Sequence, residues 1–574
     1  MLFFRKRKKQ EISFDEILLD ASNLPSFNIE RMEGRIELPL SRKSIYGVGI
    51  LFLLIASVFS GQLFKLQILQ GEALAEKGIR NSSDSAVIIA ERGIVYDRND
   101  ELVAWNELDT TGQYDFPVRA YTDRRGIGQL IGYVSYPQKD KAGFYFRTDY
   151  LGRNGIEQAY ESILHGENGK QVVEINAFGN LIAESVIDPA TAGGELHLSI
   201  DAELSEVMYD LIASTTKMNG FRSGAGAIMD IHTGEIIALT SFPSYDPEVL
   251  ADGDDIDLIQ SYNDDPRFPF LNKVIGGVYT PGSIVKPIVA YGALAENIIS
   301  PSKVIVSTGV LTVPNPYDPA HPAVFRDWRS SLGAMTIREA IAFSSNVFLM
   351  TIGGGYGDQK GLGITKLDEY FKLFGLGAKT GIQIGGEQEG LVPSPAWKQE
   401  IFQDDWRLGD TYLTAIGQFG FQTTPLQMLR AYAVLANGGT LVTPHVVKNE
   451  QGAREELSLH QDDLRVVQEG MRKAVTQNGG TARSLDRKDV AIAAKSGTAE
   501  LGASKSQVNS WVAGYFPYTE PRYAFILFME YGPRTNTVGA GSVMGKVFDW
   551  MAVNRPEYIG NEDKSEKETL VKEQ

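Results

Sequence analysis

Residues 279–287 decide the fold and read Tyr279-Thr280-Pro281-Gly282-Ser283-Ile284-Val285-Lys286-Pro287. This stretch joins a turn, a helix start and a candidate nucleophile. Pro281-Gly282 predicts the turn, and the apolar residues from Ile288 onward predict the helix. Proline lacks an N–H group and is tolerated only in the first helical turn, where backbone N–H groups have no partner within the helix. Pro287 therefore places the helix start near Ser283.

Ser283 and Lys286 are three residues apart, so both side chains lie on one face of the predicted helix, with the amine in reach of the hydroxyl. A lysine is a general base only when neutral, which requires a pKa well below its ordinary value of about 10.4. Burial, the positive end of a helix and a second cation each lower that pKa. Ser283 is the predicted nucleophile and Lys286 its base, unless they are only a helix cap and a solvated charge.

The pattern Ser-x-x-Lys also occurs at residues 214–217 and 300–303, in a polar segment and a Pro-containing loop that fit the solvated alternative. Two further motifs favour Ser283. Ser344-Ser345-Asn346 interrupts an apolar run, where polar side chains need hydrogen-bond partners. Lys495-Ser496-Gly497-Thr498 follows the predicted strand 490–494 and offers a cation and two hydroxyls to a carboxylate, while Gly497 permits close backbone approach.

Composition excludes several classes of function. The chain has 574 residues, 43% of them hydrophobic, which is enough for about three to four domains. Its net charge of -17 opposes binding to nucleic acid, and the absence of cysteine excludes thiolate nucleophiles, disulfides and cysteine metal sites. Its six histidines lack metal-ligand spacing, and no phosphate-binding loop or Gly-x-Ser-x-Gly motif is present. We expect no metal and no cofactor.

The N-terminal region predicts a membrane anchor over residues 45–68. Residues 45–64 carry no charge and would span about 30 Å as a helix, the thickness of the hydrocarbon core of a bilayer. Nine Lys and Arg precede this run and three follow it before residue 90, so we expect a cytoplasmic N-terminus and an external C-terminal part. A buried core helix would be shorter and amphipathic. A signal peptide cleaved after Ala73-Leu74-Ala75 would have its apolar run closer to the cleavage site.

The remaining chain predicts a cytoplasmic tail over residues 1–44, a β-rich spacer over 69–200, a larger domain over 201–555 and a disordered tail over 556–574. The larger domain has two early and three late strands separated by helices, which predicts an α/β sandwich. The predicted strands are 225–231, 235–240, 490–495, 511–516 and 523–531. The predicted helices are 284–296, 337–350, 365–374 and 426–435.

With its three motifs in this order, the chain resembles class B penicillin-binding proteins from the anchor to about residue 550. The spacer segments 92–99 and 155–161 are similar to signatures of that class, as are 242–247 and 424–427. The resemblance implies a penicillin-binding/β-lactamase-like α/β fold with a five-stranded antiparallel sheet between helices, preceded by one transmembrane helix and a spacer, or pedestal, domain. Two positions depart from the pattern: Asp100 replaces a glycine, and Phe419 interrupts a Gly-Gln-Gly segment.

The resemblance implies a serine D,D-transpeptidase that cross-links peptidoglycan and binds β-lactams. Ser283 would attack the D-Ala-D-Ala carbonyl of a stem peptide while Lys286 takes its proton. Ser344 would pass a proton to the leaving D-alanine, and Asn346 would hold a substrate amide. The implied substrate-binding residues are Lys495, Ser496, Gly497 and Thr498, with backbone N–H groups of Ser283 and Thr498 as the oxyanion hole.

Segments 326–328, 397–399 and 409–418 look like those of side-wall enzymes, which implies a role in elongation with a polytopic membrane glycan polymerase and other elongation-complex proteins as partners. A division transpeptidase of the same class and a catalytically dispensable scaffold are the alternatives. A secreted β-lactamase or D,D-carboxypeptidase would share the motifs but would normally lack the anchor and the spacer.

Overall fold

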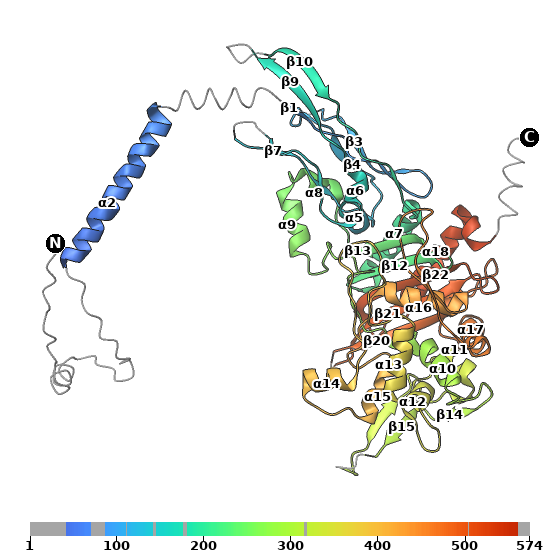
Figure 1. Cartoon of the computed structure of the whole chain (residues 1–574). Helices are drawn as coiled ribbons and strands as arrows, with labels where there is room; N and C mark the ends of the chain where they lie inside the picture. Colours follow the sequence, from blue (N-terminus) through green and yellow to red (C-terminus); the bar gives the residue numbers. More distant parts are fainter. Residues whose placement is uncertain are drawn as a thin grey trace, which may run out of the picture. The chain divides into compact units, whose positions relative to one another are not determined.

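The computed structural model describes residues 42–69, 86–110, 112–141, 145–175, 181–314, 318–502 and 504–560 (Figure 1). The chain divides into two compact units, Met1–Asp84 and Ser85–Gln574, and each is described by itself. Most of the predicted cytoplasmic tail and residues 561–574 of the predicted C-terminal tail lie outside the described residues.

The first unit contains one apolar helix. Helix α2 (Arg42–Phe64) continues as a π-helical turn, η2 (Lys65–Leu69). Within it, Tyr46–Phe64 has a mean hydropathy of 2.0 over 19 residues, a length and composition sufficient to cross a membrane. The segment agrees with the anchor predicted from residue 45.

The spacer part of the second unit is built from short strands and three short helices. One sheet has the order β1-β9-β10 and another the order β11-β2-β3-β4, with the small pairs β5-β8 and β6-β7 beside them. The strands are β1 (Ala86–Ile88), β2 (Val95–Tyr96), β3 (Leu102–Glu107), β4 (Val118–Tyr121), β5 (Val134–Ser135), β6 (Gln138–Lys139), β7 (Tyr145–Arg147), β8 (Leu151–Gly152), β9 (Gly169–Ile175), β10 (Leu181–Asp188) and β11 (Leu196–His197). The helices are α4 (Gly128–Ile131), α5 (Gly155–Ala159) and α6 (Glu161–Leu164).

An ion cluster at the centre of the spacer joins two of its sequence signatures. Arg92, from the segment 92–99, donates from Nε to Glu157 Oε2 at 2.5 Å, and Arg119 donates to Glu157 Oε1 at 2.8 Å. All three side chains are fully buried. Because a buried charge is tolerated only when it is paired, this cluster ties β2, β4 and α5 to one arrangement.

The larger part of the second unit contains a five-stranded antiparallel sheet of order β13-β12-β22-β21-β20. Its strands are β12 (Ser223–Asp230), β13 (Ile236–Phe242), β20 (Ala493–Leu501), β21 (Gln507–Phe516) and β22 (Tyr523–Pro533). The helices are α7 (Ala202–Asn219), α8 (Pro247–Asp252), α9 (Ile256–Asp264), α10 (Lys286–Ala295), α11 (Ile337–Ala342), α12 (Asn346–Gly354), α13 (Gly363–Leu373), α14 (Pro395–Phe402), α15 (Leu408–Thr414), α16 (Pro425–Asn437), α17 (Gln461–Thr476) and α18 (Ala540–Asn554). Short elements are η3 (Gly282–Val285), η4 (Arg483–Leu485), η5 (Pro556–Ile559) and the strand pairs β14 (Ile305–Ser307) with β17 (Gly333–Met335), β15 (Val310–Val313) with β16 (Ala323–Arg326), and β18 (Thr440–Val442) with β19 (Arg454–Glu456).

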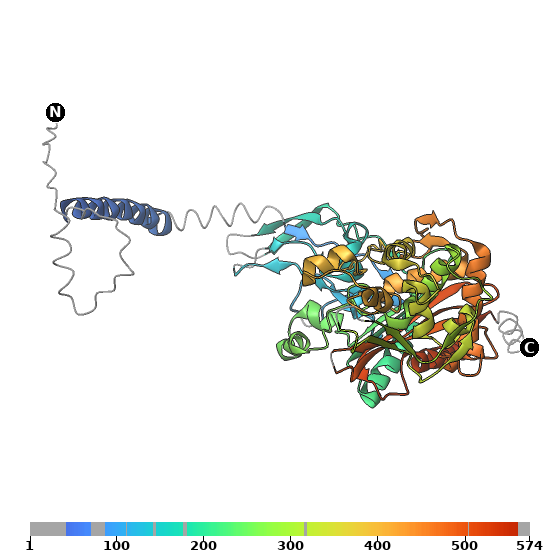
Figure 2. The same ribbon diagram turned by 90° about the horizontal axis from the view of Figure 1, so that it is seen from below.

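Helices cover both faces of this sheet. Helices α7 and α18 pack on one face, where Met208 and Phe548 share a core with Phe525. Helix α16 packs on the other, where Leu429 shares a core with Phe528. Figures 1 and 2 show green strands from the start of this part beside red strands from its end. The predicted sandwich of two early and three late strands is therefore confirmed.

Three predicted elements differ in their bounds. The helix expected over 337–350 is two helices, α11 and α12, because Ser344 adopts a φ of 58° and the chain turns there. Strand β20 runs from Ala493 to Leu501, so the 495–498 motif lies within the strand and not after it. The disordered tail expected from residue 556 is wrong for residues 556–559, because they form η5 with Tyr558 and Ile559 buried.

Candidate active site

The turn before Ser283 is fixed on both sides. Gly282 has a φ of 58°, a conformation that favours glycine, and its N–H donates to Gly417 O at 2.9 Å. On the other side, the hydroxyl of Tyr432 on α16 donates to Ile284 O at 2.8 Å. Ser283 lies in the helical turn η3 and α10 begins at Lys286, so the helix start near Ser283 is confirmed.

Strand β20 lies directly against this turn. A Cβ atom on Gly497 would come within 2.8 Å of Ile284 Cγ2, and one on Gly282 within 3.0 Å of Thr498 O. Only glycine allows the two segments to approach so closely. The fold thus brings the 495–498 motif to the turn that carries Ser283. Strand β20 is also the edge of its sheet, so half of its backbone groups face away from β21.

Lys286 is fully buried beside the second motif. Its Nζ donates to Ser344 O at 2.7 Å and Asn346 Oδ1 at 2.7 Å, and lies 3.3 Å from Ser344 Oγ. Burial lowers the pKa of Lys286 to about 7, against the opposing influence of the Asp327 carboxylate. Among the described residues, Ser283 Oγ has no hydrogen-bond partner, and the hydrogen bonds of the Lys286 amine go to the 344–346 turn.

Lys495 approaches the same turn from β20. Its Nζ donates to Ser344 Oγ at 2.8 Å and to Ser496 O at 2.6 Å, and its side chain is fully buried. Burial, and then the charge of Lys286, lower the pKa of Lys495 well below its ordinary value. Two amines that share one hydroxyl oxygen in a buried site cannot both hold a proton without a large electrostatic cost. The Ser344 hydroxyl is the group that both amines contact.

Asp327 is a buried residue of this site. In the sequence it stands out only as part of segment 326–328, which looks like that of side-wall enzymes. Its carboxylate accepts from Ser307 Oγ at 2.7 Å, from Ser345 Oγ at 2.8 Å and from the N–H of Asn346. The polar pair Arg326-Asp327 after an apolar strand was the sequence feature that could have identified Asp327 as a site residue. It did not indicate which elements the carboxylate would contact.

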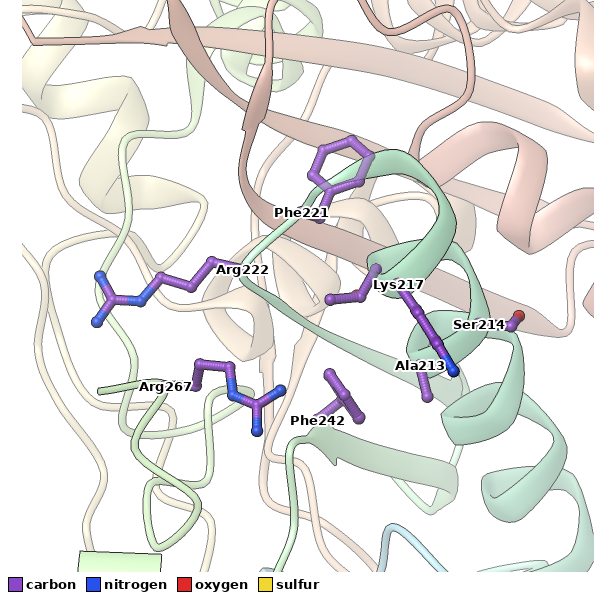
Figure 3. Close-up of a pocket in the computed structure, with 8 residues that line it drawn as sticks. Ala213, Ser214, Lys217, Phe221, Arg222, Phe242 and Arg267 are labelled. Atoms are coloured by element: carbon purple, nitrogen blue, oxygen red, sulfur yellow. The ribbon is translucent and has the colours of Figure 1, made fainter. Parts of the chain in front are cut away.

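Serine 214 provides a contrast to Ser283. Ser214 lies on the exposed face of α7 and its hydroxyl donates to Leu211 O at 3.1 Å, within its own helix. It lines a cavity of about 530 Å³ together with Lys217, Arg222 and Arg267. Figure 3 shows these three cationic side chains pointing in different directions. The Ser-x-x-Lys pattern at 214–217 therefore lacks converging partners.

Within the described part of the chain, no group of three or more His, Asp or Glu side chains is arranged to hold a metal ion. The cluster around Ser344 contains hydroxyl, amine, amide and carboxylate groups.

Family models match both parts of the second unit. One for the penicillin binding protein transpeptidase domain matches residues 224–549, which include every residue of the cluster. The chain belongs to the penicillin-binding transpeptidase family. A second model, for the penicillin-binding protein dimerisation domain, matches residues 113–198 in the spacer part.

Relatives of this penicillin-binding transpeptidase include the peptidoglycan D,D-transpeptidase MrdA of Acinetobacter baumannii, 31% identical over 77% of this chain and 68% of that protein. The MrdA protein of Escherichia coli is 29% identical over 75% of this chain and 71% of that protein. The peptidoglycan D,D-transpeptidase FtsI of E. coli is 25% identical over 78% of this chain and 70% of that protein. The chain is thus more similar to MrdA than to FtsI of the same organism.

Solved structures of penicillin-binding transpeptidases share the fold. The complex between PBP2 and MreC from Helicobacter pylori contains a chain with a TM-score of 0.68 and 25% identity, covering 82% of this chain and 98% of that one. A second structure shows the coordination of polymerization and crosslinking by a peptidoglycan synthase complex. One of its chains has a TM-score of 0.68 and 26% identity, and the match covers 91% of this chain and 99% of that one.

Two residues at which this penicillin-binding transpeptidase departs from the pattern of its class have backbone conformations that favour glycine. Asp100 has a φ of 62° and Phe419 a φ of 63°. Asp100 is exposed and interacts with His197 and Lys448 at the surface. Phe419 lies two residues after Gly417, whose carbonyl holds the turn before Ser283. Both residues thus hold a left-handed backbone conformation without being glycine.

Proposed function

We propose that this chain is a peptidoglycan D,D-transpeptidase that cross-links stem peptides through an acyl-enzyme on Ser283. The observation that carries the proposal is the meeting of Lys286 and Lys495 at the Ser344 hydroxyl, next to the turn that bears Ser283. The relatives named as peptidoglycan D,D-transpeptidases support the substrate and the reaction.

In the first half-reaction, Ser283 Oγ attacks the carbonyl carbon of the penultimate D-alanine and its proton passes to neutral Lys286. A pKa of about 7 makes that amine an effective base near neutral pH. The carbonyl oxygen becomes an oxyanion that accepts from the backbone N–H groups of Ser283 and Thr498. The C–N bond then breaks, and the leaving D-alanine amine takes a proton by way of Ser344.

Substrate binding uses the edge strand β20. The terminal carboxylate of the stem peptide pairs with Lys495 and accepts from the hydroxyls of Ser496 and Thr498. The carboxylate supplies the negative charge that buried Lys495 otherwise lacks, so binding stabilises its protonated form. Asn346 holds a backbone amide of the donor peptide. In the second half-reaction, the side-chain amine of another stem peptide attacks the ester carbonyl, forms the cross-link and returns the proton to Ser283.

We place this activity in side-wall elongation, with division as the alternative. Greater similarity to MrdA than to FtsI supports that choice. Helix α2 would anchor the protein in the membrane by one span, with the N-terminus cytoplasmic and the catalytic domain outside. The likeness to a chain of a peptidoglycan synthase complex supports a polytopic glycan polymerase as partner, and the PBP2 complex with MreC supports further elongation proteins.

Labelling with a β-lactam tests the activity. We expect mass spectrometry of the labelled full-length protein to place the adduct on Ser283, and Ser283→Ala to abolish labelling. Ser214→Ala is the matched control, because it removes the hydroxyl of another Ser-x-x-Lys pattern and should label like the wild type. An adduct on another residue, or labelling of Ser283→Ala, would disprove the mechanism.

Depletion in the host tests the cellular role. Rounded or swollen cells support elongation, whereas filaments with blocked septa assign the protein to division. Complementation with Ser283→Ala then separates enzyme from scaffold, because a purely structural protein would restore cell shape without its nucleophile.

A further inference from the structure

Asp327 occupies the loop that follows β16, and its side chain is only 9% exposed. Three groups donate to its carboxylate: the hydroxyls of Ser307 and Ser345 and the backbone N–H of Asn346. Ser307 ends β14 and Ser345 caps α12, where it also accepts from Phe348 N at 3.2 Å. One carboxylate therefore joins three separate elements at the point where the 344–346 turn forms.

None of these donors carries a charge. Among the described residues, no Lys, Arg or His side chain forms an ion pair with Asp327. A buried carboxylate without a directly bonded cation is unfavourable unless a positive charge lies elsewhere in the same site. The charge that acts on Lys286 from this side is the Asp327 carboxylate, which raises the pKa of the amine, while Lys286 in turn lowers the pKa of Lys495.

Asn346 connects the carboxylate to Lys286. Its backbone N–H donates to Asp327, while its side-chain Oδ1 accepts from Lys286 Nζ at 2.7 Å. The side-chain Nδ2 donates to Arg326 O at 3.1 Å, which leaves Oδ1 directed at the amine. Residues 326 and 327 thus orient both polar ends of Asn346, and Asn346 in turn orients the predicted base.

Lys286, Lys495 and Asp327 are the three ionisable side chains of the cluster, and together they set its net charge. The Asp327 carboxylate raises the pKa of Lys286 against the effect of burial, so a proton on this amine has a nearby negative charge to offset it. Without the carboxylate, that proton would be an uncompensated buried charge, and Lys286 would lose affinity for it.

We propose that Asp327 is a positioning residue for the transpeptidase reaction, which holds the 344–346 turn through two hydrogen bonds, ties it to β14 through a third, and keeps Lys286 a strong base through its negative charge. The inference rests on the proposed function, because it assigns Lys286 as the base of acylation. It assigns to Asp327 an effect on the pH dependence of the reaction that a purely structural residue would not have.

The test is the acylation rate of full-length protein by a fluorescent penicillin across pH, comparing wild type with Asp327→Asn. The rate rises as Lys286 loses its proton. Removing the negative charge lowers the pKa of that amine, so the acidic limb of the profile should move to lower pH by about one pH unit. The plateau rate should fall about tenfold, because a weaker base accepts the Ser283 proton less readily.

Asp318→Asn is the matched control. It removes the same charge from an exposed residue that pairs with His321 at the surface, and its profile should match the wild type. An Asp327→Asn limb that stays at the wild-type pH, or moves upward, would overturn the proposal. If the wild type is not acylated at all, it is the proposed function that fails.

A second variant covers the case in which Asp327→Asn does not fold. Ser307→Ala removes one hydrogen bond to the carboxylate and leaves its charge in place. We expect a lower plateau with an unmoved acidic limb. A limb that shifts in Ser307→Ala would show that hydrogen bonding and not charge sets the basicity of Lys286, which would also overturn the proposal.

Discussion

Replacing Phe419 by glycine restores the residue pattern of the family at a position where the backbone already has the glycine conformation. The substitution removes an aromatic ring that lies edge-on to two others. Trp397 is 5.9 Å from the Phe419 ring at an interplanar angle of 87°, and Trp406 is 5.6 Å away at 84°. Lys398 Nζ lies 5.7 Å from the same ring centroid. Two opposite effects therefore compete, lost contacts and relieved backbone strain.

The lost contacts should dominate. Two edge-to-face ring pairs contribute about 0.5–1.5 kcal/mol each beyond the area they bury. A non-glycine residue at positive φ costs about 1 kcal/mol, which the glycine returns. Glycine also loses more backbone entropy on folding, about 0.5–1 kcal/mol. We therefore expect Phe419→Gly to destabilise the protein by about 1–2 kcal/mol.

Residual penicillin labelling after heating measures this effect in the full-length protein, because only a folded site is acylated. The midpoint temperature should fall by about 2–5 °C. Asp100→Gly is the matched control: it relieves the same strain but loses only exposed ion pairs with His197 and Lys448, worth about 0–1 kcal/mol. Its midpoint should change by less than that of Phe419→Gly. A raised midpoint for Phe419→Gly would refute the reasoning, since strain would then outweigh the aromatic contacts.

Two further outcomes concern the site itself. Because the pKa of Lys286 is lowered to about 7 and only the neutral amine is a base, we expect wild-type acylation by a β-lactam to rise with pH through about 7 and then level off. A profile that is flat across this pH would contradict the assignment. The same depressed pKa means that the unfolded chain binds more protons above that pH, so the unliganded protein should gain stability as pH rises from about 7 toward the ordinary lysine value. Lys286→Met should flatten this dependence in denaturant titrations. Tyr432→Phe leaves the buried carbonyl of Ile284 without its donor and should lower stability by about 1–2 kcal/mol and slow acylation. Tyr412→Phe removes the hydroxyl of another buried tyrosine, which donates to a carbonyl at the end of α12, and should lower stability without slowing acylation. Equal acylation rates of the two variants would show that the Tyr432 contact does not position Ser283.

The five strands and the groups of the site were predictable because both leave local signals. Strand β12 is buried along its whole length, and its residues 225–229 form an uninterrupted run without polar side chains. Lys286, Ser344, Asn346 and Lys495 stand out because polar side chains in apolar surroundings need partners. Their hydrogen bonds to one another agree with that expectation, while their roles in the reaction stay proposals.

The shape of the turn at 344–346 was not predictable from periodicity. Apolar residues on both sides of Ser344 continue the helical pattern, and the break depends on tertiary contacts from Asp327 and Lys286 that are distant in sequence. Asp327 itself lies in a loop, where no repeating pattern indicates which neighbours a side chain will have. The extent of β20 was missed for a related reason, because polar residues at 495–498 read as the end of a strand and the contact with η3 is what orders them.

The pairing of β12 with β22 has a consequence for synthesis of the protein. Ser223 and Glu530, hydrogen-bonded neighbours in the finished sheet, are 307 residues apart in sequence. At a translation rate of about 5–20 residues per second, the hairpin of β12 and β13 waits about 15 to 60 s before its partner strand has been made. During that time one apolar edge of the hairpin is open to any other extended segment. Slower synthesis lengthens this exposure, and a truncation before β22 would leave this edge permanently exposed.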